Sequence, residues 1–259
     1  MKIWYQTYAA LGTDPKRRRY VEDLKTYVQT VARPDTQVAV HGVEKYAPKM
    51  NDSDYIQFMH IPQVIDKALQ AEREGYDAFV LGGTLDLGSP YLREVLDIPV
   101  AFIAESSFYN ACLLARKFGI ISANEKLLRR QMELVKYHGL EQRCVPGVHL
   151  GFPLQEFGDL QASRPEYVTD IFTEAARKLI STGAGAIIPG SGAMGSSFSR
   201  QGIHDIDGVP IVDIVAAVVK TAEMLVDLKD LGVKRSRIGS YTYVSKEELM
   251  AARKLYGVE

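Results

Sequence analysis

The 259-residue chain contains only two cysteines, Cys112 and Cys144, and neither belongs to a CxxC motif or a Cys/His cluster. This scarcity excludes a disulfide-rich scaffold and gives no support to a structural zinc site. An excess of charge of one sign is also lacking, because 31 Lys and Arg residues stand against 32 Asp and Glu residues, for a net charge of -1. A strongly basic surface for nucleic acid or an anionic membrane is therefore excluded, and we expect neither partner.

Long apolar runs are missing as well. The most apolar stretch, VPIVDIVAAVVKTAEMLV, carries Asp213, Lys220 and Glu223, so it lacks the roughly 20 consecutive apolar residues that span a bilayer. Near the N-terminus, Gln6 and Thr7 interrupt the apolar stretch that a signal peptide needs. These absences predict a cytoplasmic protein without membrane spans, and 46% hydrophobic with 24% charged residues is typical of a globular fold.

What is present is an alternation of short apolar runs with longer stretches of helical period. This alternation predicts an α/β fold with mainly parallel sheets flanked by helices. In the first helical stretch, residues 16–32, apolar side chains recur at three- and four-residue spacing, and we expect the Lys/Arg run at 16–19 to be solvated. Hydroxyl–Glu pairs predict helix starts at Ser122/Glu125, Ser163/Glu166 and Ser245/Glu248. The expected strands are residues 2–8, 36–41, 77–82, 99–104, 118–122, 143–149, 186–190 and 210–213.

An internal repeat organises the chain. EGYDAFVLGGTLDLGS, from Glu74, and TGAGAIIPGSGAMGSS, from Thr182, each combine a glycine, an apolar strand and a glycine-rich turn, and Gly190 follows Gly82 by 108 residues. The duplication predicts two pseudo-symmetric lobes, residues 1–103 plus about 214–259 and residues 104–213, with the active site in the cleft between them. Both turns fall at the carboxyl ends of predicted strands, where open parallel sheets bind ligands.

The two turns supply the predicted substrate site. Their glycines permit close backbone approach, and N–H groups at the helix starts that follow favour a carboxylate. Any one of these glycines taken alone is explained by a tight turn, whereas the matched pair favours a site. Hydroxyl groups nearby are natural hydrogen-bond donors to a carboxylate or a ring carbonyl. The predicted substrate-binding residues are Tyr8, Gly82, Gly83, Thr84, Ser106, Gly190, Gly192, Ser196 and Ser197.

At EGYDAFVLGG, LREVLDIPVAFIAES, FGIIS, GAGAIIPGSGAM and DGVPIVDIVAAVVKTAE, the sequence resembles the aspartate/glutamate racemase superfamily, and within it the hydantoin and allantoin racemase branch. The resemblance covers most of the chain and implies two α/β lobes, no metal and no organic cofactor. Racemases of this superfamily usually carry one cysteine on each duplicated turn, at positions that align with Gly83 and Ser191. A two-thiol reaction is therefore not expected. Arylmalonate decarboxylases of the same superfamily share the glycine–threonine pair found at Gly83 and Thr84, but they keep the second cysteine.

The predicted catalytic residues are Asp86, Glu105, Ser191 and His204. Asp86 and Glu105 are candidate bases, because partial desolvation between lobes raises the pKa of a carboxyl toward neutrality. The alternative for Asp86 is a cap of the short helix from Pro90 or an Asx-turn, and the alternative for Glu105 is a helix cap. His204 follows the second turn as a candidate acid or base, with a surface position as its alternative. A serine hydrolase is weakly supported, because GSGAM does not meet the GxSxG pattern, and the histidines show no metal-ligand spacing.

We expect an enzyme, by family default an isomerase or racemase, that acts on a small carboxylate or a hydantoin-like cyclic ureide by cysteine-independent acid/base chemistry. A hydrolase or lyase for the same ligand class is the first alternative, because Gly83 leaves space on one face for water or a departing group. A non-catalytic ligand-binding relative is the second. We expect no cofactor, and a homo-oligomer.

Overall fold

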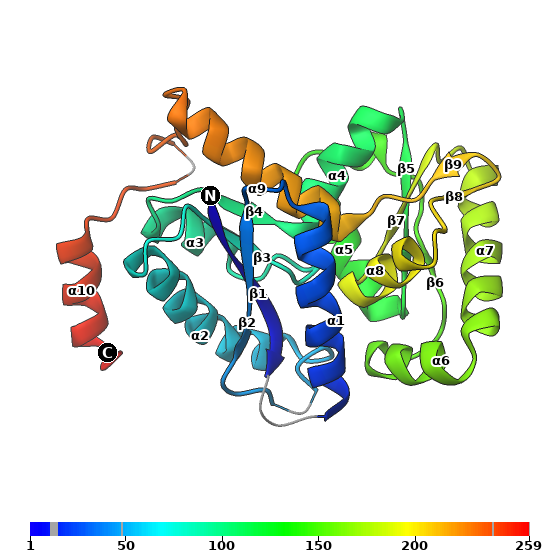
Figure 1. Cartoon of the computed structure of the whole chain (residues 1–259), viewed down its shortest axis with the longest axis horizontal. Helices are drawn as coiled ribbons and strands as arrows, with labels where there is room; N and C mark the ends of the chain where they lie inside the picture. The colour runs from blue at the N-terminus through cyan, green and yellow to red at the C-terminus, as the bar shows by residue number, and fades with distance from the viewer. Residues whose placement is uncertain (11–14, 48, 240, 259) are drawn as a thin grey trace.

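The computed structural model describes residues 1–10, 15–47, 49–239 and 241–258, and in the first helix it describes side chains from Tyr20 onward. The chain forms two lobes side by side, each built on a parallel sheet with helices around it (Figure 1). This architecture confirms the predicted α/β class. The prediction that the Lys/Arg side chains at 16–19 are solvated falls outside the described side chains.

The first sheet has the strand order β2-β1-β3-β4. Successive residues of β1 point to opposite faces, so that Ile3 and Tyr5 pack in one core cluster and Trp4 packs in another. Helix α1 (Pro15–Val31) covers the face of Ile3, and α2 (Asp54–Arg73) with α3 (Ser89–Val95) covers the face of Trp4. The strands are β1 (Lys2–Ala10), β2 (Gln37–Val43), β3 (Ala78–Leu81) and β4 (Val100–Phe102).

The second sheet has the order β6-β5-β7 and is surrounded by its own helices. Phe172 of α7 and Phe198 of α8 pack against each other in its core, with ring centroids 4.1 Å apart and the rings tilted by 36°. A small antiparallel pair, β8 (Asp205–Ile206) and β9 (Val209–Pro210), adjoins it. The remaining elements are β5 (Phe118–Ser122), α5 (Glu125–Tyr137), β6 (Val148–His149), α6 (Phe157–Ser163), α7 (Pro165–Ser181), β7 (Ala186–Pro189) and α8 (Gly192–Arg200), with 3-10 turns at Glu141–Arg143 and Leu154–Glu156.

Two helices cross between the lobes. Helix α4 (Ile103–Leu114) follows β4 of the first sheet yet also packs against β5 and β7, whereas α9 (Ile214–Asp230) follows the second sheet and packs against β3 and β4. The two helices contact each other where the lobes meet (Figure 1). β7 lies 108 residues after β3, as the repeat predicts. The exact residue boundaries of the two lobes stay a prediction.

The apolar segment that contains Asp213, Lys220 and Glu223 lies largely in α9 and packs inside the protein. Neither this helix nor any other among the described residues is long and apolar enough to cross a membrane.

Several predicted elements differ from the structure at their ends. The strand predicted at 143–149 is reduced to β6, with Cys144 in an isolated bridge to Phe118, because Pro146 has no N–H for the ladder. The strand predicted at 210–213 is β9 with an isolated bridge at Ile211. The capping pairs Ser122/Glu125 and Ser163/Glu166 are wrong, because α5 begins after Asn124 and α7 after Arg164. The Ser245/Glu248 box is confirmed.

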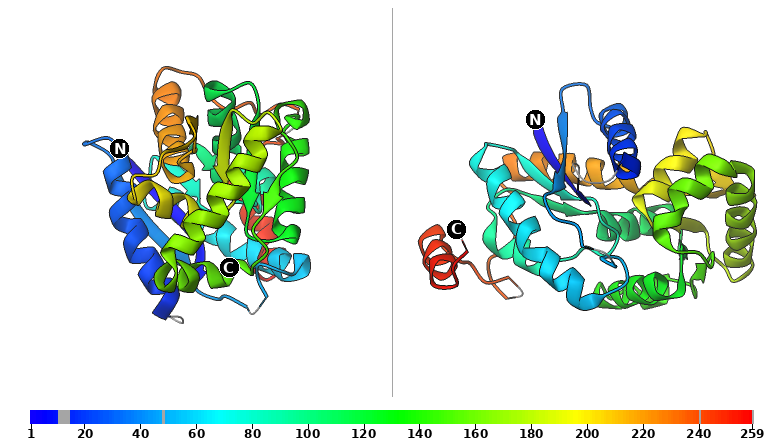
Figure 2. Two further views of the ribbon diagram at one scale, coloured as in Figure 1. Left: turned by 90° about the vertical axis from the view of Figure 1, so that its right-hand side faces the viewer. Right: turned by 90° about the horizontal axis from the view of Figure 1, so that it is seen from below.

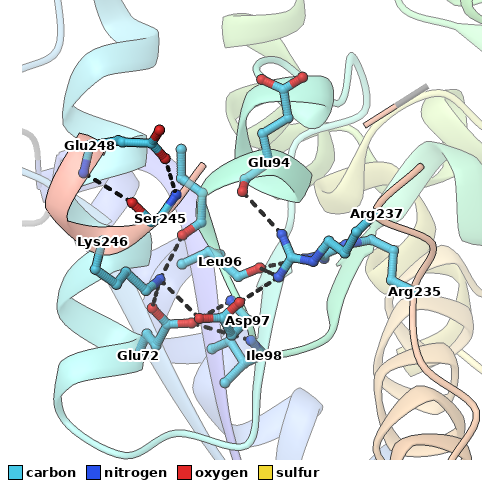
Figure 3. A network of polar contacts seen from close by, with 11 residues as sticks. Glu72, Glu94, Leu96, Asp97, Ile98, Arg235, Arg237, Ser245, Lys246 and Glu248 are labelled. Carbon is cyan, nitrogen blue, oxygen red and sulfur yellow. Dashed lines mark hydrogen bonds and ion pairs between the residues drawn. The ribbon is translucent and has the colours of Figure 1, made fainter. Parts of the chain in front are cut away.

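The C-terminal segment runs back along the outer edge of the first lobe and ends in α10 (Lys246–Leu255) (Figure 2). Figure 3 shows how it is held. The guanidinium of Arg237 donates to the carbonyl oxygens of Glu94 and Leu96, at 3.1 and 3.0 Å, and to the Asp97 carboxylate. Lys246 Nζ donates to the Val95 carbonyl at 2.8 Å and also bonds Glu72. The segment is therefore anchored to the end of α3.

Candidate functional site

A cavity of about 540 Å³ lies between the lobes, where the carboxyl ends of β1 and β3 face those of β5 and β7. Residues 7–9 and 82–85 with Leu87 line it from the first sheet, and Asn124 with residues 191–193 lines it from the second. This volume accommodates a small organic ligand. The rest of the described lining is Tyr20, Asp23, Tyr46, Met50, Asn51, Gln57, Leu127, Leu154, Gln155, Phe157, Gly158, Asp159, Gln161, Ala162, Ser197 and Arg200.

The two glycine-rich turns face each other directly. Thr84 Oγ1 donates a hydrogen bond of 2.9 Å to the carbonyl oxygen of Gly190, which also accepts from Gln131 Nε2 at 2.7 Å. A Cβ atom added at Gly192 would lie 3.9 Å from the carbonyl oxygen of Gly82. The duplicated turns therefore meet in a single cleft. Because the Thr84 hydroxyl donates to Gly190, it is left as an acceptor toward a ligand.

Ser191 begins α8 and lies at the cavity wall. It is the N-cap residue, and its Oγ accepts the N–H of Met194 at 3.2 Å. The hydroxyl proton of Ser191 makes no bond within the described part of the chain. The N–H groups of Gly192 and Ala193 open the helix without an intrahelical acceptor, so they can bind an oxygen that carries negative charge.

The Tyr8 ring fills the space beside Gly83. A Cβ atom added at Gly83 would lie 1.9 Å from Cε2 and 2.4 Å from Cδ2 of Tyr8. The Tyr8 hydroxyl oxygen accepts the N–H of Leu87 at 2.9 Å. Burial, with the nearby Asp86 carboxylate, raises the pKa of Tyr8 well above its usual value, so the phenol keeps its proton.

Asp86 differs from its expected position in the cleft. Its side chain is 3% exposed and is not among the lining residues of the cavity. Instead Oδ1 accepts the N–H of Ala104 at 3.0 Å and Oδ2 accepts the N–H of Glu105 at 2.9 Å, so Asp86 caps α4. Burial raises the pKa of Asp86 to about 7, against the lowering effect of those two N–H groups. The expected capping alternative was also misplaced, since the capped helix is α4 and not α3.

Glu105 and His204 also lie away from the lining. The Glu105 carboxylate forms an ion pair with Arg93, which also donates to the Tyr241 hydroxyl at 3.1 Å. His204 is exposed on the loop before β8. Neither side chain lines the cavity, so the prediction that Glu105 and His204 lie next to a substrate does not agree with the structure.

The predicted substrate-binding residues divide into two sets. Tyr8, Gly82, Gly83, Thr84, Gly192 and Ser197 line the cavity, as does the predicted catalytic Ser191. Three others do not. Ser106 is buried within α4, Ser196 is buried on α8, and Gly190 lies behind the turn with its N–H bonded to the Ile121 carbonyl.

Comparison with known proteins accounts for this arrangement. Residues 18–222 match the Asp/Glu/Hydantoin racemase family. The chain belongs to this family. It is 33% identical to a hydantoin racemase of Pseudomonas sp. (strain NS671), over 88% of each chain, and 27% identical to one of Rhizobium meliloti, over 86% of this chain and 85% of that one.

Solved structures show the same fold at lower identity. An allantoin racemase of Klebsiella pneumoniae has a TM-score of 0.78 at 24% identity, covering 95% of this chain and 94% of that one. An arylmalonate decarboxylase mutant has a TM-score of 0.61 at 16% identity, covering 87% and 92%. As a member of the Asp/Glu/hydantoin racemase family, the chain is an enzyme of the racemase superfamily, and the expectation of an isomerase is supported.

Several residues that line the cavity of this racemase-family protein were not predicted from the sequence. Tyr20 and Asp23 come from α1, and Arg200 at the end of α8 pairs with Asp23 at 3.0 Å. Burial raises the pKa of Tyr20 to about 12, with Arg200 opposing it. Asp159 reaches the lining from α6. A helical pattern gives no signal for such residues, because the face they occupy is defined only when the second lobe is placed.

The two cysteines lie outside the described cavity lining, and the described residues form no cluster of possible metal ligands. Cys112 and Cys144 are not among the described residues that line the cavity, and burial raises the pKa of Cys144 to about 12. Within the described ranges, no three His, Cys, Asp or Glu side chains gather in a group that could hold a metal ion.

Proposed function

We propose that this chain inverts the configuration of a small cyclic ureide, such as a substituted hydantoin, at the carbon next to a carbonyl. A small carboxylate is the other member of the proposed substrate class. The observation that carries the proposal is that the two duplicated turns, which contact each other, both line a single cavity of about 540 Å³. Relatives named hydantoin racemase support the choice of the ureide.

The proposed chemistry uses hydrogen-bond donors. Removal of a proton from the carbon next to a carbonyl leaves negative charge on the carbonyl oxygen, and donors fixed in position stabilise that charge. On the second turn these are the Ser191 hydroxyl and the N–H groups of Gly192 and Ala193, which also suit a carboxylate. Neither cysteine is required, because neither is among the lining residues.

We propose that one of the lining carboxylates accepts the proton, and that water in the cavity returns a proton to the opposite face of the carbon. Asp23 and Asp159 lie in the cavity wall, and Asp23 also pairs with Arg200. The carboxylates of Asp86 and Glu105 lie away from the cavity. We propose that Asp86 acts as a positioning residue, by holding the start of α4. His204 has no place in the proposed site.

The test uses one enantiomer of 5-methylhydantoin in deuterium oxide at neutral pH, with a sample lacking protein as the blank. We expect the circular dichroism to decay and deuterium to enter at the ring carbon together. Ring opening without exchange would indicate a hydrolase. Ligand-induced thermal stabilisation with neither reaction would indicate a binding protein. Loss of carbon dioxide from an arylmalonate, tested separately, would indicate a lyase.

Ser191→Ala tests the donor role of the Ser191 hydroxyl in the same assay. Removing one donor from an oxyanion site commonly lowers kcat by roughly 100-fold, and we expect a loss of that order. Ser181→Ala, on the exposed end of α7, is the control and should keep the full rate. Equal rates in both variants would exclude Ser191 from the site.

We also propose that the protein works as a cytoplasmic homo-oligomer. Large apolar side chains are exposed on α4 and at the C-terminus, among them Leu113 at 85% and Tyr256 at 80%. Clusters of such side chains commonly mark contact surfaces. Light scattering on the purified protein tests this, and a monomeric mass would contradict it.

A further inference from the structure

We infer that the Tyr8 phenol takes the place of a side chain at position 83, and that its hydroxyl is the hydrogen-bond donor that the first turn presents to the substrate. The inference deepens the proposed function and rests on it. Tyr8 comes from the end of β1, far from residue 83 in the chain. It would thus give the first turn a polar group that Gly83 itself does not have.

Space alone excludes a side chain at Gly83. The φ angle of Gly83 is not in the left-handed region, so its backbone conformation is open to other residues. A Cβ atom would nevertheless lie 1.9, 2.4 and 2.5 Å from three carbons of the Tyr8 ring. Separations this short do not occur between atoms that are not bonded to each other. Any residue larger than glycine at position 83 therefore requires Tyr8 to move.

Tyr8 is held on several sides, so such a movement is costly. Its ring meets the ring of His60 edge to face, with centroids 5.4 Å apart at 90°. His60 is 4% exposed, and its Nδ1 is bonded to Gln63 Nε2 at 2.9 Å. The Tyr8 hydroxyl oxygen is fixed by the Leu87 N–H at 2.9 Å. These contacts keep the ring against Gly83.

The hydroxyl proton of Tyr8 is available to a ligand. Tyr8 lines the cavity and is partly exposed, and its oxygen acts as an acceptor from Leu87. No bond donated by this hydroxyl reaches another described residue. Burial raises its pKa well above the usual range, so the group remains a donor and cannot serve as the base. A substrate oxygen on the Gly83 side is the acceptor that fits.

The two turns then differ in how they present a donor. On the second turn the hydroxyl belongs to Ser191 itself, whereas on the first it comes from a tyrosine of another strand. The ring of Tyr8 thereby narrows the first side of the cleft. A substrate oxygen at Tyr8 and another at the start of α8 would place the reacting carbon in the cavity beside both turns.

The first experiment tests the steric part without any substrate. Gly83→Ala is made in the natural protein and in a Tyr8→Ala background, and the urea midpoint is measured for all four proteins. We expect Gly83→Ala to lower the midpoint clearly when Tyr8 is present and to leave it within error when Tyr8 is absent. An equal shift in both backgrounds would overturn the steric coupling.

The second experiment tests the donor. Tyr8→Phe keeps the ring and removes the hydroxyl, which also leaves the Leu87 N–H without its acceptor. We therefore expect a modestly lower urea midpoint, a kcat for 5-methylhydantoin lowered roughly 10- to 100-fold and a smaller change in KM. Tyr76→Phe, whose hydroxyl lies 3.5 Å from His41 and outside the cavity lining, is the control and should keep the full rate. A Tyr8→Phe protein with the natural kcat would overturn the donor role.

The outcomes also separate this inference from the proposed function. If the natural protein and the Tyr8→Phe variant are equally active, the proposed isomerase activity is supported and the donor role of Tyr8 is contradicted. If the natural protein exchanges no deuterium, the isomerase fails. The donor role of Tyr8 is then tested by the shift in melting temperature that 5-methylhydantoin produces. This shift should be smaller for Tyr8→Phe than for the natural protein, and an equal shift would overturn the donor role.

Discussion

At the scale of single residues, Asp86 is a buried carboxylate that does not reach the cavity. Asp86 has a φ of 46°, an uncommon conformation for a residue with a side chain, and its two carboxylate oxygens each accept one backbone N–H of α4. Its contribution is therefore structural. It holds the turn after β3 against the start of a helix that crosses to the second lobe.

Replacing Asp86 by Asn tests this role. An amide has one acceptor oxygen for two N–H groups, so we expect the free energy of unfolding to fall by about 1–3 kcal/mol in urea titrations. Asp207→Asn is the matched control, because Asp207 also has a positive φ, of 51°, but is exposed and pairs with Arg177. The control should change stability by less than about 0.5 kcal/mol. Equal losses in both variants would attribute the effect to backbone strain instead of the cap.

His60 gives a pH dependence of known sign. Burial lowers its pKa from 6.5 to about 4, so the unfolded chain binds a proton more readily than the folded chain between these values. The contribution of His60 is complete above pH about 6.5 and is lost as the pH falls toward 4. We expect His60→Gln to remove a fall in stability of roughly 1–3 kcal/mol between pH 7 and 4.5. Parallel pH curves for the two proteins in urea unfolding would contradict this.

The sequence identifies the turns of the site well and its charged residues poorly. Gly83, Thr84 and Ser191 were located because glycine-rich turns at the ends of repeated strands form a local pattern. Asp86 and Glu105 belong to the correct segments, but their side chains bind partners whose positions depend on the folded chain. No local sequence feature shows whether a carboxylate near a predicted site acts as a catalytic base or as a helix cap.

At the scale of elements, the same sequence pattern has three different outcomes. Ser245 and Glu248 form a full capping box at α10. At α5 the side chain of Asn124 accepts the N–H of Leu127, so the helix begins later than Ser122 predicts. Ser163 ends α6, and its hydroxyl donates to the Asp159 carbonyl at 2.6 Å. The spacing of a Ser and a Glu therefore does not by itself fix the residue at which a helix begins.

The capping box predicts a local effect. Ser245→Ala should destabilise α10 by about 1 kcal/mol, seen as hydrogen exchange at residues 246–255 that is faster by roughly fivefold. The global urea midpoint should stay unchanged, because α10 contributes no buried residue. Ser163→Ala is the control and should leave exchange in α7 as it is. Unchanged exchange in α10 after Ser245→Ala would show that Arg237 and Lys246 hold the helix without its cap.

At the scale of the whole molecule, the two lobes are joined around the cleft by polar contacts. Arg130 of α5 pairs with Asp54 of α2 at 2.9 Å, and Arg200 of α8 pairs with Asp23 of α1 at 3.0 Å. The two-lobe arrangement was predictable from the 108-residue repeat. These contacts were not, because they join segments without any shared pattern.

The position of the thiols predicts resistance to alkylation. Neither cysteine is among the described residues of the cavity lining, and burial raises the pKa of both thiols, which suppresses the reactive thiolate. Treatment with iodoacetamide, and the Cys112→Ala/Cys144→Ala variant, should both leave the initial rate within about twofold of the natural protein. The rate is measured as deuterium uptake of 5-methylhydantoin. Abolished uptake in both would assign the chemistry to a thiol.

The crossing of α4 and α9 makes the stability of each duplicated half depend on the other. Each helix follows one sheet in the chain and packs on part of the other sheet, so the core of each lobe includes a helix from the other. A fragment that contained one lobe alone would expose the apolar surface that its neighbour's helix now shields. The two halves are therefore expected to fold together as one cooperative unit, because each supplies a helix to the packing of the other.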